Sequence, residues 1–171
     1  MSIIDKHARR YFTQYIKQCL IAIAVVVAIL FFLDIARYTV IVASLGATTF
    51  VVFAIPHSYS AVARRICGGY LVGVAVGISL FYVDTYLAAL PFIHAEVLNI
   101  VIGGTAVGAS IFIMAITNTE HPPAAGLSMG LTFNPWSVEA IIVIFIAVFT
   151  LCLCKHFLRK WLINMHETTG T

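Results

Sequence analysis

The stretch that breaks the apolar sequence of this chain is TNTEHPPAAG at residues 117–126. It places a glutamate, a histidine and two consecutive prolines directly after a long apolar run. Each proline fixes φ near about −65° and lacks a backbone N–H, so one continuous helix cannot pass through this point. A new helix can begin at Pro122 or Pro123, with His121 in its N-cap region. The stretch therefore predicts two helices that meet at a break.

The composition around this stretch is that of a membrane protein. Of the 171 residues, 61% are hydrophobic and 10% are charged. A soluble domain has about a quarter of its residues charged, so an ordinary cytosolic enzyme and a nucleic-acid reader are both excluded. At roughly 20 residues per span, the chain has room for about five crossings of the lipid bilayer and for no soluble domain. We expect one membrane domain over residues 1–171.

The apolar runs predict an all-α, polytopic helical membrane protein with about five transmembrane helices. A basic lead-in at residues 1–17 precedes a helical membrane core at about 18–160, and a tail follows at 161–171. The proline-broken segment near His121 is predicted either to re-enter the membrane or to cross it. The five predicted spans cover residues 19–33, 38–55, 66–83, 97–117 and 137–157.

The distribution of Lys and Arg predicts the orientation. Cytoplasmic loops carry an excess of these residues, so we expect a cytoplasmic N-terminus and, two crossings later, cytoplasmic Arg64 and Arg65. The basic residues that follow the last predicted span would lie outside after five crossings. Either the rule fails at this last helix, or residues 118–135 cross the membrane as a broken helix. The sequence leaves both alternatives open.

Glycines recur at four-residue spacing in two of the predicted spans. Small residues at this spacing allow two helices in lipid to approach closely, so both stripes predict helix packing. The two stripes consist of Gly69, Gly73 and Gly77 in one span and of Gly104 and Gly108 in another.

A faint internal repeat relates GATTF at residues 46–50 to GASIF at residues 108–112. Each copy leads into an apolar stretch that ends at a proline-containing polar break. The copies lie two crossings apart, so they run in the same direction and their polar ends are expected to meet on one side of the membrane.

Five features along the chain resemble the pattern of the HPP family, which is named for a His-Pro-Pro triplet. They are GAT at 46–48, FAIPHS at 53–58, Arg64, the glycine pair at 68–69, and HPP at 121–123. The match spans about residues 44–130. The chain departs from the family pattern at Tyr59, at Val62-Ala63 and at Glu120. The resemblance implies a small integral membrane protein, and because some members are implicated in nitrite transport, it also implies a small inorganic anion as substrate.

The HPP stretch predicts a binding site for that anion. Free N–H groups of Ala124 and Ala125, at the positive end of a helix, can hold a small anion. A protonated His121 would attract the anion, and Glu120 would either stabilise that proton or compete with the anion for it. The predicted substrate-binding residues are His57, Ser58, Arg64, Thr117, Thr119, Glu120, His121, Pro122, Pro123, Ala124 and Ala125.

Other chemistry finds no support in the sequence. The four cysteines lie within or beside apolar runs and are expected to be packing residues. There is no His-Glu-x-x-His motif, nucleophile elbow or phosphate-binding loop, so we predict no catalytic residue, no metal and no cofactor.

The prediction is therefore a homo-oligomeric transporter or channel for a small inorganic anion, with nitrite as the first candidate, in a bacterial inner membrane. The alternative is a non-transporting scaffold, sensor or assembly subunit. Transport predicts that ionisable and hydroxyl groups converge on a cavity, whereas a scaffold predicts that His121 packs against a carbonyl with no cavity beside it.

Overall fold

The computed structural model describes residues 10–33, 39–90 and 94–165, and this part of the chain is helical with no strand. Four of its helices are long and apolar enough to cross a membrane, and a shorter apolar helix accompanies them. The predicted all-α membrane fold is confirmed. The ends of the lead-in and of the tail lie outside the described residues. The elements are α2 (Phe12–Leu33), α3 (Thr39–Ala54), η2 (Tyr59–Ala61), α4 (Ala63–Ala88), α5 (Ala95–Thr117), α6 (Pro122–Phe133) and α7 (Val138–Leu158).

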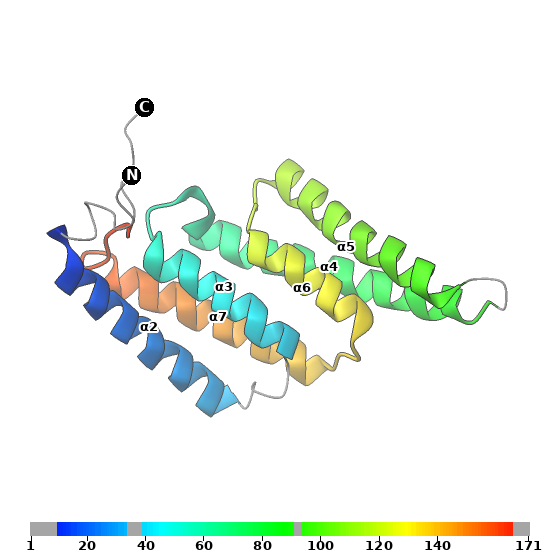
Figure 1. Ribbon diagram of the computed structural model, residues 1–171, viewed down its shortest axis with the longest axis horizontal. Helices are drawn as coiled ribbons and strands as arrows, with labels where there is room; N and C mark the ends of the chain where they lie inside the picture. Colours follow the sequence, from blue (N-terminus) through cyan, green and yellow to red (C-terminus); the bar gives the residue numbers. More distant parts are fainter. Residues whose placement is uncertain (1–9, 34–38, 91–93, 166–171) are drawn as a thin grey trace, which may run out of the picture.

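The short helix α6 carries the chain back across the molecule. It runs beside α4 in the same direction, since Gly69 of α4 lies against His121 and Gly77 lies against Leu131. Consecutive helices alternate in direction throughout Figure 1, and α6 shares in this alternation. Of the two alternatives for residues 118–135, the structure supports the crossing as a broken helix.

A helix of 12 residues is about 18 Å long, well short of the roughly 30 Å hydrocarbon core of a bilayer. The neighbouring helices compensate for this, because α6 packs against α3, α4 and α5. Most of its residues are buried, among them Ala124, Leu127 and Ser128. The polar backbone at the N-terminal end of α6, around His121 and Pro123, is thereby kept from lipid, as a non-helical segment at membrane depth requires.

The first glycine stripe brings α4 and α6 into contact. A Cβ on Gly73 would lie 2.4 Å from the carbonyl oxygen of Ala124, and a Cβ on Gly77 would lie 2.7 Å from that of Ser128. At Gly69 a Cβ would lie 2.6 Å from the Cβ of His121. These positions admit no side chain, so the stripe places the start of α6 directly on α4.

The predicted packing of the second stripe, Gly104 and Gly108, is not seen among the described residues. A Cβ on Gly104 or on Gly108 would meet nothing within 4 Å. Both glycines lie on the exposed face of α5, so they do not support helix packing within the described chain. In its place, Gly103 faces the ring of Phe133, 3.0 Å from a Cβ built on that glycine.

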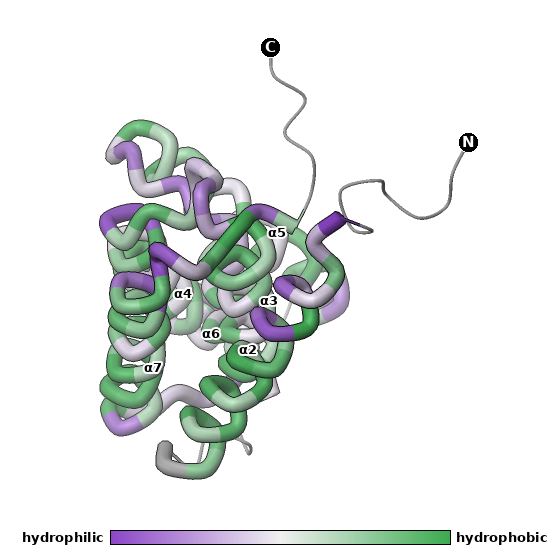
Figure 2. The backbone as a smooth tube through the Cα atoms, turned by 90° about the vertical axis from the view of Figure 1, so that its left-hand side faces the viewer, coloured by the Kyte–Doolittle hydropathy of each residue, from purple (hydrophilic) through white to green (hydrophobic). Residues whose placement is uncertain are grey.

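Because consecutive helices run in opposite directions, their charged residues gather at the two ends of the helix bundle. At the basic end lie all the described Lys and Arg residues, namely Arg10, Lys17, Arg64, Arg65, Lys155, Arg159 and Lys160. At the opposite, acidic end lie Asp84, Glu96 and Glu139. The helices are predominantly hydrophobic (Figure 2). Because α6 crosses, the C-terminal basic residues no longer conflict with the positive-inside rule, which predicts that the basic end is cytoplasmic.

This topology predicts the outcome of labelling from either side. In a background whose four cysteines are replaced, single cysteines at Arg64 and at Lys160 are expected to react with an impermeant maleimide from the cytoplasmic side. A cysteine at Val138, which is 67% exposed, is expected to react from the other side. Labelling of positions 64 and 138 from the same side would contradict the crossing by α6.

Candidate functional site

The break between α5 and α6 is stabilised by its own residues. Asn118 adopts the left-handed conformation, with φ 56° and ψ 46°, and ends α5. The backbone N–H of Thr119 donates to the carbonyl of Met114 at 2.9 Å. The hydroxyl of Thr117 bonds the Ile113 carbonyl at 2.7 Å and lies 2.8 Å from the Thr119 hydroxyl. The hydrogen bonds of Thr117 and Thr119 therefore satisfy polar groups at the C-terminal end of α5.

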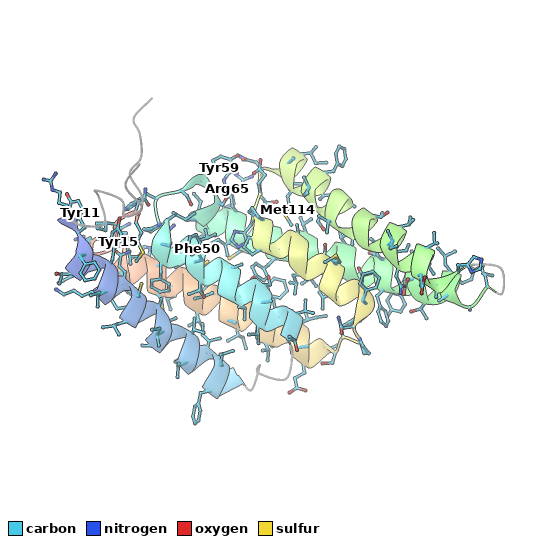
Figure 3. All side chains as sticks on the ribbon, viewed as in Figure 1. Tyr11, Tyr15, Phe50, Tyr59, Arg65 and Met114 are labelled. Carbon is cyan, nitrogen blue, oxygen red and sulfur yellow. The ribbon has the colours of Figure 1, made fainter. Side chains whose placement is uncertain are left out.

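A polar group of four residues joins this break to the start of α4, and we call it the Arg65 cluster: Tyr59, Arg65, Asn118 and Glu120. The Arg65 guanidinium donates to the Glu120 carboxylate and to the Asn118 side-chain oxygen. Tyr59 donates from its hydroxyl to Asn118 at 3.0 Å, and its ring faces the guanidinium at 3.0 Å from the centroid. Figure 3 shows Tyr59 and Arg65 together where α4 begins. The Arg65 side chain is 11% exposed and that of Glu120 is 37% exposed.

His121 lies behind this cluster in a second network. Its Nδ1 is 3.1 Å from the Ser60 carbonyl oxygen, and its Nε2 is 2.9 Å from the Thr48 hydroxyl. The Tyr70 hydroxyl lies 2.8 Å from that of Thr48 and 2.9 Å from that of Ser44. Ser44 also reaches the Pro123 carbonyl at 2.9 Å. We call this series, from the Ser60 carbonyl to the Pro123 carbonyl, the His121 chain.

The His121 ring is fully buried, although it belongs to the loop between α5 and α6. Both ring nitrogens have a partner within the protein. A ring buried in this way favours the neutral imidazole, because the charged form loses its hydration. The adjacent Glu120 does not bond the ring, because its carboxylate is held by Arg65 and Tyr59.

The predicted anion site at the N-terminus of α6 needs correction. The prolines at the first two positions have no N–H, and the N–H of Ala124 already donates to the His121 carbonyl at 3.0 Å. Ala124 is completely buried and Ala125 is 6% exposed, so an anion cannot reach the backbone there. The prolines remove the unpaired donors that would otherwise attract an anion.

With this geometry in place, the comparison with known proteins can be stated. The family model described as HPP, transmembrane region, matches residues 7–167, which is nearly the whole chain. The chain belongs to the HPP family. No curated protein and no solved structure matches it significantly. The membrane fold of this HPP protein is therefore shown by its family and by its helices together.

The two polar breaks of this HPP protein meet, as the internal repeat predicts. Tyr59 and Ser60 follow the first break, after α3, and they bond Asn118 and His121 of the second. The helices α3 and α5, which carry the two copies of the repeat, both run toward the basic end (Figure 1).

The three residues of the first break that were predicted to bind the anion lie in three different surroundings. Arg64 is exposed, and its neighbour Arg65 makes the contacts to Glu120. His57 bonds the C-terminal segment, through its Nε2 to the Leu162 carbonyl at 3.1 Å. The Ser58 hydroxyl is buried and has no hydrogen-bond partner among the described residues.

The spacing along α4 contains a signal that distinguishes the two arginines. Arg65 precedes Gly69, Gly73 and Gly77 by multiples of four residues, so it lies on the stripe that faces α6. Arg64 is displaced by about 100° around the helix and faces solvent. Within the apolar runs, nothing in the sequence marks the hydroxyl groups of Ser44, Thr48 and Tyr70 as members of the His121 chain.

A groove of about 390 Å³ reaches the His121 chain from the side. It lies between α3 and α6, and Ser44 and Pro123, which end the chain of hydrogen bonds, form part of its wall. The groove extends along α3 toward the acidic end as far as Thr39. Ionisable and hydroxyl groups thus converge at a packed interface whose inner end borders this groove.

Proposed function

We propose that this HPP protein carries a small inorganic anion across the membrane, with nitrite as the first candidate, and that Arg65 recognises the anion. The supporting observation is the Arg65 guanidinium, nearly buried at the basic end and bound to the carboxylate of Glu120. The proposal assigns no catalytic residue. It places the bound anion at the Arg65 cluster and not at the N-terminus of α6, where the sequence predicts it.

The chemistry of the pair supports nitrite as the ligand. A carboxylate and a nitrite ion both present two equivalent oxygens on a bent planar group, and the guanidinium fork matches this geometry. Glu120 occupies the position that the anion would take. Because its side chain is more exposed than that of Arg65, it can leave toward solvent when an anion arrives. Glu120 then acts as an internal counter-ion for the empty site.

The proposal includes a homo-oligomer in a bacterial inner membrane, with the basic end in the cytoplasm. Short helices such as α3 and α6 are shielded more completely from lipid when a second copy of the chain covers them.

The test compares the two adjacent arginines. Arg65→Gln is expected to lower nitrite uptake into proteoliposomes at least about tenfold, since a charged hydrogen bond contributes about 1.5–3 kcal/mol. The matched control Arg64→Gln, at the exposed neighbour, is expected to keep the uptake of the unmodified protein. Equal uptake by both variants would refute Arg65 as the anion-binding group.

A non-transporting membrane subunit is the second candidate, and one specific observation favours it. His121 is completely buried, and both of its ring nitrogens have partners within the protein. This is the arrangement expected of a residue that joins helices. The uptake assay separates the candidates, because a scaffold gives no nitrite uptake above that of empty liposomes.

A further inference from the structure

The His121 chain contains one more hydrogen-bond link than a neutral imidazole can fill. Its five contacts join two carbonyl oxygens through one imidazole and three hydroxyl groups. A neutral ring and three hydroxyls supply four protons, and the carbonyls supply none. The position of the unfilled link therefore determines the direction of the whole chain.

The neutral arrangement can be assigned from the acceptors alone. The Ser60 carbonyl can only accept, so Nδ1 carries the ring proton and Nε2 accepts from Thr48. The Pro123 carbonyl can likewise only accept, so Ser44 donates to it, and the Tyr70 hydroxyl donates either to Thr48 or to Ser44. The unfilled link is therefore one of the two at the Tyr70 hydroxyl.

This arrangement is suited to accept a proton at the groove. When a proton reaches the Ser44 oxygen, Ser44 passes a proton to Tyr70, Tyr70 passes its own to Thr48, and Thr48 passes its own to Nε2. Each group loses one bond to hydrogen and gains another, and the proton that remains on Ser44 donates to the Pro123 carbonyl. All five links are then filled, so the imidazolium leaves no buried donor unpaired.

We propose that Ser44, Tyr70 and Thr48 form a proton relay from the groove between α3 and α6 to His121, and that this relay couples proton movement to anion movement. The proposal rests on the proposed function, because the anion at Arg65 supplies the negative charge that the imidazolium needs.

The charges around His121 explain why both ions are required. From α4 the ring faces Tyr70, and Arg65 of the same helix is neutralised by Glu120. From α3 it faces only hydroxyl groups, and from η2 it faces the Ser60 carbonyl. On α7, Lys155 donates to the carbonyl of Ala61, the residue that follows Ser60 in the sequence. An anion that displaces Glu120 takes over its charge at Arg65, and the freed carboxylate stays in the chain next to His121. The region around the ring then holds one more negative charge, which favours protonation of His121, and by linkage the proton favours the anion.

The test measures nitrite and protons together in proteoliposomes that contain a pH-sensitive dye. The flux of nitrous acid through protein-free liposomes is subtracted. The unmodified protein is expected to move about one proton with each nitrite ion, as one chargeable imidazole allows. Thr48→Val and Tyr70→Phe each remove one hydroxyl from the relay and are expected to lower this ratio at least about threefold.

The neighbouring threonine provides the matched control. Thr49 bonds only the Leu45 carbonyl of its own helix, so Thr49→Val is expected to keep the ratio of the unmodified protein. Thr48→Ser keeps the hydroxyl and is expected to restore the ratio, which separates the loss of the relay from a packing defect. If Thr48→Val does not fold, Tyr70→Phe decides the result.

The outcomes separate the relay from the proposed function. An unmodified protein that carries nitrite without protons overturns the relay alone. Variants at Thr48 and Tyr70 that fold and keep the original ratio also overturn it. An unmodified protein that carries no nitrite refutes the proposed function and the coupling with it.

Discussion

Replacing Gly73 with leucine is expected to prevent α6 from packing on α4. Even the first carbon of the new side chain would lie 2.4 Å from the backbone oxygen of Ala124, and a backbone group cannot turn aside as a side chain can. Overpacking of this kind costs about 3 kcal/mol or more. We expect Gly73→Leu to lower the thermal midpoint in detergent sharply and to reduce the yield of monodisperse protein.

Gly104 provides the control for that variant. Gly104→Leu introduces the same side chain into an α-helix at a position where it meets nothing within 4 Å. We expect its thermal midpoint in detergent to stay close to that of the unmodified protein. Similar losses in both variants would mean that leucine harms these helices without regard to the contact between α4 and α6.

His121→Ala is the second variant with a large expected effect. It removes a completely buried ring and leaves the Ser60 carbonyl and the Thr48 hydroxyl without their shared partner. The expected loss of stability is about 3 kcal/mol, which combines a cavity with buried groups that lack hydrogen bonds. The thermal midpoint in detergent checks this, and an unchanged midpoint would contradict the network.

The sequence predicts the helices well because bilayer thickness imposes a length on each apolar run. The predicted spans at 97–117 and 137–157 lie within a few residues of α5 and α7. The helix α6 could not be assigned in this way, since 12 residues are too few to span a membrane alone. Its crossing depends on the helices around it, and only the tertiary structure reveals these.

The candidate site, too, could be predicted only in part from the sequence. The prolines and His121 are correctly placed at a break, because proline acts on its own backbone. The partners of His121 come from α3 and from the turn before α4, more than sixty residues away in the chain, and no local pattern links them. A free helix end at Ala124 would bind an anion, but the two prolines lack an N–H and the N–H of Ala124 already donates to the His121 carbonyl.

The position of the Arg65 cluster determines how the membrane voltage acts on this protein. If the basic end faces the cytoplasm and the protein carries an anion, as proposed, that anion crosses most of the electric field on its way from the acidic end to Arg65. A voltage that is negative inside opposes this movement by about 2.3 kcal/mol per 100 mV. Under the proposed coupling, a proton carried to His121 cancels the charge of the anion. The pair then moves without electrical work, so its distribution follows the difference in pH across the membrane and not the voltage.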